Sequence, residues 1–173
     1  ARLLADHLAF DYADVSALRQ FAQDLDAVTY EFENVPVEAA RYLERLVPVY
    51  PPPIALEKAQ DRFVEESFFC ELGIPTPGFT TDLRKGFSLP VVLKTRRMGY
   101  DGKGQKIVNS ATDLENMSSG EMILEEFISF DREVSIIGVR SISGEMKFYP
   151  LAENHHREGI LRLSLVTEDI SSK

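Results

Sequence analysis

The stretch VVLKTRRMGYDGKGQ, residues 91–105, decides the fold class of this chain. An apolar run ends at Lys94, and three glycines follow before a second strand-like run at residues 105–108, so the pattern predicts strand, glycine-rich loop, strand. Glycines let backbone amides approach a ligand, and a strand lysine supplies a point charge for phosphate oxygens. The stretch indicates a nucleoside triphosphate site, with a plain hairpin turn as the alternative. It is not a Walker A loop, because no G-K-[ST] opens a helix.

The composition excludes several classes of protein. A chain of 173 residues with 44% hydrophobic content can bury the core of one domain or of two small ones. The net charge of −9 comes from acids spread along the chain, which argues against a nucleic-acid partner. No apolar run reaches the roughly 18 residues of a membrane span, so we expect no membrane partner. The single cysteine, Cys70, fits a reducing, cytoplasmic compartment, and its helical, apolar surroundings predict a buried, inert thiol.

Residues 1–50 alternate between strand and helix patterns. Strands are expected at residues 27–32 and 47–50, and helices from Asp14 or Ser16 to residue 25 and from Pro36 to residue 45. This order predicts a parallel α/β sheet, in which ligands bind beyond the carboxyl ends of the strands. The segment YEFENVP, residues 30–36, follows the first strand and is a candidate binding edge. The alternative is that Asn34 caps the next helix and the two glutamates are merely exposed.

Three prolines at residues 51–53 mark a connection, after which two helices are expected, at residues 54–59 and 62–72. Asp61 caps the second helix and Gly73 ends it. Arg62 lies in the first turn, where a cation opposes the helix dipole, so an ion pair or a functional role is worth considering. The rigid segment IPTPG, residues 74–78, predicts a domain boundary.

The remainder is rich in strand patterns, expected at residues 90–95, 105–108, 122–128, 133–140, 146–153 and 161–166, with a helix near residues 112–117. A Ser-Gly pair within residues 141–145 predicts a hairpin turn. These elements favour an antiparallel sheet with a helix against it.

Several polar residues in this half are candidate ligand contacts. Glu125 and Glu126 are adjacent in an apolar strand, so one must face inward, where it needs a donor, either a purine amino group or a neighbouring Lys or Arg. Glu133 is either an exposed strand residue or an acceptor for a ribose hydroxyl. The histidine pair at 155 and 156 is a ligand contact or a surface feature, because too few Cys and His residues accompany it for a zinc site.

Six phrases in fixed order bear a resemblance to a known family. They are TYEFENVP at 29–36, AQDR at 59–62, LKTRRMGYDGKGQ at 93–105, ILEEFI at 123–128, DREVS at 131–135 and FYPLAENHHREGILRLS at 148–164. The chain resembles the ATP-grasp ligases and, more closely, the 5-(carboxyamino)imidazole ribonucleotide synthase family of purine biosynthesis.

The resemblance implies a combined α/β and α+β architecture, ATP-grasp in type. Residues 1–53 would form part of a preATP-grasp domain, residues 54–78 a helical linker and residues 79–173 the central, β-rich lid domain, with the C-terminal ATP-grasp domain absent. The implied activity is an ATP-dependent carboxylation of 5-aminoimidazole ribonucleotide by bicarbonate through carboxyphosphate. Mg²⁺ would bridge the phosphates, with its ligands outside this segment, and the enzyme would be a cytoplasmic homodimer. We expect the segment alone to be inactive.

The resemblance also assigns roles to single residues. The phosphates would be bound by Arg62, Lys94, Gly99, Tyr100, Asp101, Gly102, Lys103, Gly104 and Gln105. The adenosine would be bound by Glu125, Glu126, Phe127, Ile128, Glu133 and His156. The aminoimidazole ribonucleotide would be bound by Tyr100, Asp101, Lys103 and Glu33, with Glu31 as the alternative to Glu33. The catalytic residues would be Lys94, Tyr100, Asp101 and Lys103.

Two rival functions remain. Another ATP-grasp ligase, such as a biotin carboxylase or a glycinamide ribonucleotide transformylase, would share the lysine, the loop and the acidic strand. A nucleotide-binding module without turnover belongs to a different class.

Overall fold

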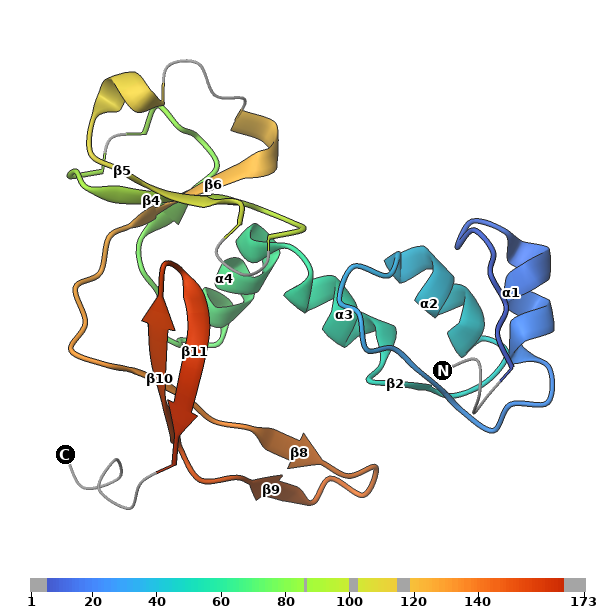
Figure 1. Cartoon of the computed structure of the whole chain (residues 1–173). Helices are drawn as coiled ribbons and strands as arrows, with labels where there is room; N and C mark the ends of the chain where they lie inside the picture. Colours follow the sequence, from blue (N-terminus) through green and yellow to red (C-terminus); the bar gives the residue numbers. More distant parts are fainter. Residues whose placement is uncertain (1–5, 86, 100–102, 115–118, 167–173) are drawn as a thin grey trace.

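The computed structural model describes residues 6–85, 87–99, 103–114 and 119–166 of the chain. Figure 1 shows an N-terminal α/β unit, two linking helices and a β-rich half that contains three sheets.

The N-terminal unit comprises α1 (Val15–Ala22), β1 (Val28–Thr29), α2 (Val37–Glu44) and β2 (Val49–Tyr50). β1 and β2 pair in parallel, which confirms the predicted sheet. Apolar side chains from both helices and both strands, among them Leu18, Leu43 and Val49, form the core of this unit. The Asp14 carboxylate caps α1 by accepting from the backbone N–H of Ala17, at 3.0 Å.

The start of α2 contradicts the interpretation that Asn34 caps this helix. Its N-cap residue is Pro36, and no side chain makes a capping hydrogen bond there, so Asn34 does not cap the helix. Proline fixes the backbone for helix entry without a side-chain cap. The other half of that interpretation is confirmed, because Glu31 and Glu33 are both exposed.

Two short helices, α3 (Pro53–Ala59) and α4 (Arg62–Glu71), link the N-terminal unit to the β-rich half (Figure 1). The Asp61 carboxylate caps α4 by accepting from the backbone N–H of Phe63, as the sequence predicts. The expectation of a buried thiol is wrong, because Cys70 is exposed. It lies in the last turn of α4, where its Sγ is 3.4 Å from Thr76 Oγ1 rather than enclosed by apolar side chains.

A four-stranded antiparallel sheet follows, in the order β3 (Phe79–Thr80), β6 (Met122–Glu126), β4 (Val91–Thr95) and β5 (Gln105–Val108). One face packs a core that contains Val91, Leu93 and Leu124. The opposite face lies over α4, whose Phe63 ring meets the ring of Phe79 edge-on at 5.7 Å. Between β5 and β6 the structure has short 3-10 turns, η1 (Ala111–Asp113) and η2 (Ser119–Glu121), and part of the expected helix lies outside the described residues.

The last five strands form two smaller antiparallel sheets. One has the order β11 (Ile160–Leu165), β10 (Ala152–Arg157), β7 (Glu133–Ser135), and the other pairs β8 (Gly138–Arg140) with β9 (Met146–Phe148). Two strands expected from the sequence are each broken in two, because β7 pairs with β10 whereas β8 pairs with β9. The predicted hairpin turn is confirmed by the hydrogen bond from Ser141 N–H to Glu145 C=O. Within the residues described, no helix is long and apolar enough to cross a membrane.

Candidate active site

The strand lysine of the glycine-rich stretch points toward the acidic strand. Lys94 Nζ lies 2.6 Å from Glu125 Oε2, and the side chain of Glu125 is only 5% exposed. In the register of β4 and β6, Glu125 faces Val92, so it is the diagonal neighbour of Lys94 on one face of the sheet. The inward acid is therefore Glu125, and its donor is a lysine.

The second oxygen of this carboxylate has no donor among the described residues. Glu125 Oε1 is buried without a hydrogen-bond partner among the described residues. A buried carboxylate oxygen is costly unless a donor reaches it. The pair can therefore accept one further donor, such as an amino group, from a ligand.

Glu126 points to the opposite face and has a different role. Its Oε2 accepts a hydrogen bond from the backbone N–H of Gly78 at 3.0 Å, and its own backbone N–H donates to Gly78 C=O. A Cβ at Gly78 would lie 2.7 Å from this carboxylate, so a larger residue would displace the Glu126 side chain from this position. Glu126 thus fixes the end of β6 to the segment that precedes β3.

Arg62 holds the start of the glycine-rich loop. Its guanidinium donates to Thr95 C=O at 2.7 Å, and its backbone N–H donates to Arg96 C=O at 2.9 Å. A Cβ at Gly99 would lie 3.0 Å from the Arg62 guanidinium, and a Cβ at Gly104 would lie 2.6 Å from Thr95 Oγ1. Gly104, which also has a φ of +79°, is thus needed for close approach, whereas a Cβ at Gly99 would be tight against the Arg62 side chain. The unfavourable helix position of Arg62 is explained by these contacts.

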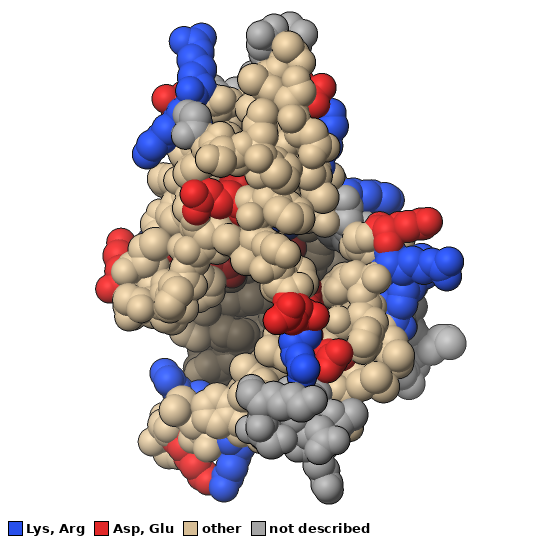
Figure 2. All heavy atoms as spheres, turned by 90° about the vertical axis from the view of Figure 1, so that its left-hand side faces the viewer, with Lys and Arg blue, Asp and Glu red and all other residues tan. Residues whose placement is uncertain are grey.

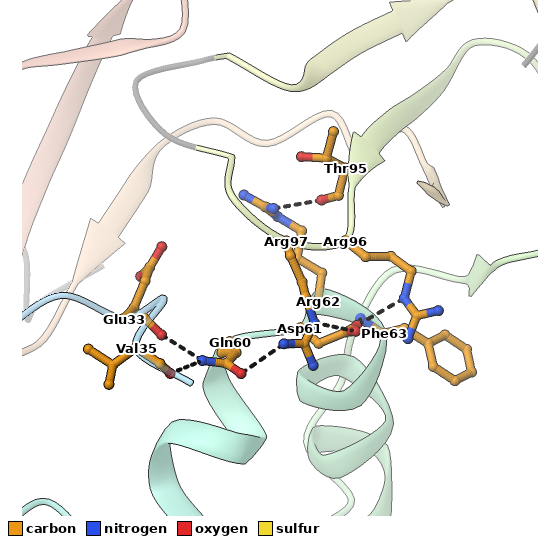
Figure 3. Close-up of polar contacts among 9 residues, drawn as sticks. All are labelled: Glu33, Val35, Gln60, Asp61, Arg62, Phe63, Thr95, Arg96 and Arg97. Atoms are coloured by element: carbon orange, nitrogen blue, oxygen red, sulfur yellow. Dashed lines mark hydrogen bonds and ion pairs between the residues drawn. The ribbon is translucent and has the colours of Figure 1, made fainter. Parts of the chain in front are cut away.

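Asp61 gathers two arginines beside Arg62 (Figure 3). Asp61 is only 4% exposed. Its carboxylate accepts hydrogen bonds from Arg96 Nε at 3.0 Å, from Arg96 Nη2 at 2.8 Å and from Arg97 Nε at 3.2 Å. Burial raises the pKa of Asp61, but the hydrogen bonds from Arg96 and Arg97 and the charge of Arg96 outweigh burial and hold this pKa below its ordinary value. The carboxylate therefore stays charged and fixes the turn after β4.

Glu65 and Glu66, on α4, are two site residues that the sequence analysis missed. Burial raises the pKa of Glu65; the charges of Glu33 and Glu125 add to this effect, and those of Arg62 and Lys94 oppose it. Burial and the charge of Glu125 likewise raise the pKa of Glu66, and Glu66 Oε2 is buried without a partner among the described residues. Glu65 and Glu66 follow Arg62 by three and four residues, a spacing that places all three on one face of a helix. That spacing was the signal available in the sequence.

The segment at residues 30–36, here called the glutamate loop, contains both candidate substrate ligands, and the two differ in their surroundings. Glu31 lines a largely apolar hollow of about 530 Å³ inside the N-terminal unit, together with Phe10, Phe21 and Tyr30. The backbone C=O of Glu33 instead accepts from Gln60, and its carboxylate points away from Gln60 (Figure 3). The charge of Glu33 contributes to the raised pKa of Glu65, on α4, whereas Glu31 lines the hollow.

Glu133 and His156 lie together on another sheet. His156 Nδ1 is 3.5 Å from Glu133 Oε1, and Asn154 donates to the same oxygen at 3.4 Å. The register of β10 against β11 shifts between His155 and His156, and His155 lies near Glu153 instead. The two histidines therefore have separate acidic neighbours.

The other predicted site residues divide into two groups. Lys103, Gln105, Phe127 and Ile128 are exposed at or next to the ends of β5 and β6. Tyr100, Asp101 and Gly102 lie outside the described residues. The face of the molecule in Figure 2 has acids and bases interspersed around a hollow between its upper and lower parts.

The described residues do not fit a metal centre. Across residues 6–85, 87–99, 103–114 and 119–166, no group of three or more His, Cys, Asp or Glu side chains could hold a metal ion. Lys94 and Arg62 offer positive charge to an anionic ligand at this face of the sheet.

A strand lysine, a glycine-rich turn and an acidic strand on a sheet that follows an α/β unit define a class of nucleotide-binding proteins. A family model described as "ATP-grasp domain" matches residues 67–173, and one described as "Ribonucleotide synthetase preATP-grasp domain" matches residues 1–60. The chain belongs to the ATP-grasp family and joins a preATP-grasp unit to an ATP-grasp unit. The predicted boundaries at residues 53 and 78 stay predictions.

Within this family the chain is similar to N5-carboxyaminoimidazole ribonucleotide synthases. It is 45% identical to the synthase of Pseudomonas aeruginosa over 96% of this chain and 50% of that protein. The crystal structure of the synthetase from Thermus thermophilus matches with a TM-score of 0.82 at 48% identity, over 94% of this chain and 47% of that one. The Staphylococcus aureus synthetase complexed with ADP matches with a TM-score of 0.83 at 30% identity, over 95% and 48%. The chain spans about half the length of these relatives.

Proposed function

We propose that the protein containing this chain uses ATP and bicarbonate to carboxylate the exocyclic amine of 5-aminoimidazole ribonucleotide, giving the carboxyamino product, ADP and phosphate. The observation on which this rests is the Lys94 and Glu125 pair, whose second carboxylate oxygen is buried without a partner among the described residues. The similarity to N5-carboxyaminoimidazole ribonucleotide synthases supports the choice of substrate.

The reaction needs two transfers. Bicarbonate oxygen attacks the terminal phosphorus of ATP, which forms carboxyphosphate and releases ADP. The amine of the ribonucleotide then attacks the carboxyl carbon, which releases phosphate and a proton. Both steps depend on positioning and on stabilising charge at the transferring phosphate.

Four residues of this chain have a role in that scheme. Lys94 binds the phosphate chain, because Glu125 already holds its ammonium group in one orientation. Arg62 supplies a second cation and keeps the turn at residues 95–97 in place. Glu125 Oε1 accepts from the adenine amino group, and Glu33 meets the ribonucleotide from the N-terminal unit.

Further roles are assigned by the resemblance alone. The backbone of residues 99–105 surrounds the phosphates, with Tyr100, Asp101 and Lys103 toward the ribonucleotide. Residues 126–128 line the adenine, and Glu133 and His156 meet the ribose side. Mg²⁺ would accompany the triphosphate and neutralise part of its charge. A homodimer and a cytoplasmic location complete the proposal.

The test is ATP consumption by the intact protein with bicarbonate present. We expect release of ADP to depend on added 5-aminoimidazole ribonucleotide. Stimulation by biotin or by formate with glycinamide ribonucleotide would instead identify another ATP-grasp ligase. Binding of ATP without consumption under any of these conditions would identify a nucleotide-binding module.

A further inference from the structure

Gln60, between α3 and α4, uses its whole amide group in contacts with two different parts of the chain. Its Nε2 donates to the backbone C=O groups of Glu33 and Val35, each at 2.9 Å, and its Oε1 accepts from Arg97 Nη1 at 2.8 Å. The residue is 7% exposed. Figure 3 shows the glutamate loop on one side of Gln60 and the arginines on the other.

Only one orientation of this amide satisfies these neighbours. The two carbonyl oxygens can only accept, and the Arg97 guanidinium can only donate. Rotating the amide by half a turn would bring its oxygen against two acceptors and its NH₂ group against a donor. The contacts therefore demand a side chain that donates on one side and accepts on the other.

Arg97 connects Gln60 to the residues that follow β4. Arg97 Nε also lies 3.2 Å from Asp61 Oδ2, and the same carboxylate binds Arg96 through two hydrogen bonds. These arginines follow Lys94 and Thr95 directly in the chain. An unbroken series of hydrogen bonds thus joins Glu33 to the end of β4.

We propose that Gln60 is a positioning residue that couples the glutamate loop to the end of β4, so that nucleotide bound at Lys94 fixes the substrate-side loop. This inference rests on the proposed function, because that function assigns Glu33 to the ribonucleotide and Lys94, in β4, to ATP. Gln60 touches neither substrate and acts through the backbone of Glu33 and Val35. Coupling of this kind appears as a change in the affinity for one ligand when the other is bound.

The test compares three variants of the intact protein. Gln60→Glu keeps the acceptor for Arg97 but cannot donate to the two carbonyl groups. Arg97→Met removes the opposite end of the same contact. Gln20→Glu, on the exposed side of α1, is the matched control for the added charge.

Ligand binding measured without bicarbonate, so that no turnover occurs, separates a positioning role from a loss of folding. We expect Gln60→Glu to raise the Kd of 5-aminoimidazole ribonucleotide about tenfold when ATP is bound and by less than about twofold when ATP is absent, within the usual range for coupled sites. Arg97→Met should act in the same direction, and Gln20→Glu should match the wild type. Equal changes in this Kd with and without ATP, or no change in either, would overturn the coupling.

Amide hydrogen exchange gives a readout that does not need turnover. In the wild type, ATP should slow exchange at residues 31–35 as well as in β4 and β6, and in Gln60→Glu only the strands should respond. Protection of residues 31–35 in the variant would refute the inference. A wild type that binds ATP but shows no ribonucleotide-dependent consumption would count against the proposed function, while the exchange result would still decide the coupling.

Discussion

Lys94 and Glu125 form an ion pair across neighbouring strands, with Nζ and Oε2 only 2.6 Å apart. The lysine side chain is 25% exposed and the carboxylate side chain 5%, so one end of the pair is accessible and the other is enclosed. A lysine in water would be free to rotate, whereas this one is oriented in advance. Its orientation reduces the entropy that a phosphate ligand must otherwise overcome.

Replacing Lys94 tests its role in binding phosphate. Lys94→Ala should weaken ATP binding by about 1.5–3 kcal/mol, the usual contribution of a hydrogen bond to a charged group. Calorimetric titration of the intact protein measures the change. Lys106→Ala, an exposed lysine of β5 in the same sheet, is the control and should bind ATP normally. Equal affinity for ATP in the wild type and in Lys94→Ala would show that Lys94 does not bind the phosphates.

The pair also affects stability. Lys94→Ala leaves the Glu125 carboxylate buried and unpaired, which should cost about 3 kcal/mol in the free energy of unfolding. Adding Glu125→Gln should restore part of this loss, since the amide has no charge to desolvate. Urea unfolding of the two single variants and the double variant measures this. Additive effects would show that the pair is not coupled in solution.

Asp61 gives a pH-dependent prediction. Its pKa is lowered in the folded protein, so its contribution to stability is complete above the ordinary value of 3.8 and is lost as the pH falls through the lowered pKa. Asp61→Asn should therefore destabilise the protein by about 3 kcal/mol at neutral pH, and by less in strong acid. Unfolding curves at neutral pH and in strong acid, with exposed Asp26→Asn as the control, measure this. A difference independent of pH would contradict it.

Glu66 should behave in the opposite sense. Its pKa is raised in the folded protein, so stability falls as the pH rises from the ordinary value of 4.5 through the raised pKa. Glu66→Gln should raise the Tm at neutral pH and leave it nearly unchanged below the ordinary pKa. Thermal unfolding under the two conditions is the measurement, with exposed Glu71→Gln as the control. A lower Tm at neutral pH would mean that the carboxylate is stabilised by contacts stronger than its desolvation.

The glutamate loop offers a choice between two acids. Glu33→Gln should raise the KM for 5-aminoimidazole ribonucleotide at least about tenfold, the effect of losing a charged hydrogen bond. Glu31→Gln should leave that KM unchanged, because Glu31 lines the hollow of the N-terminal unit. The reverse pattern would assign the substrate contact to Glu31.

Local sequence patterns predicted much of this fold. The Asp14 and Asp61 caps, the β4 strand and the inward turn of one acid at 125 and 126 all follow from spacing and side-chain chemistry. The long strands expected at residues 133–140 and 146–153 are broken, because each half pairs with a different partner. The choice of pairing partner depends on contacts between residues distant in sequence, and local periodicity carries no information about them.

The site was less accessible to prediction. Lys94 and Glu125 could be singled out from the sequence, but not as partners, since the register of β4 and β6 is a tertiary property. Gln60 gave no signal beyond its place in the AQDR phrase. Its importance comes from two carbonyl groups and one guanidinium that the fold brings together.

The exposed Cys70 has a practical consequence. It is the one thiol in this chain and lies at the opposite end of α4 from the residues that meet the arginines. A maleimide fluorophore attached there would report on tilting of that helix without an added attachment point in this part of the protein. Titrating ATP against such a labelled sample would convert a hidden rearrangement into an optical signal.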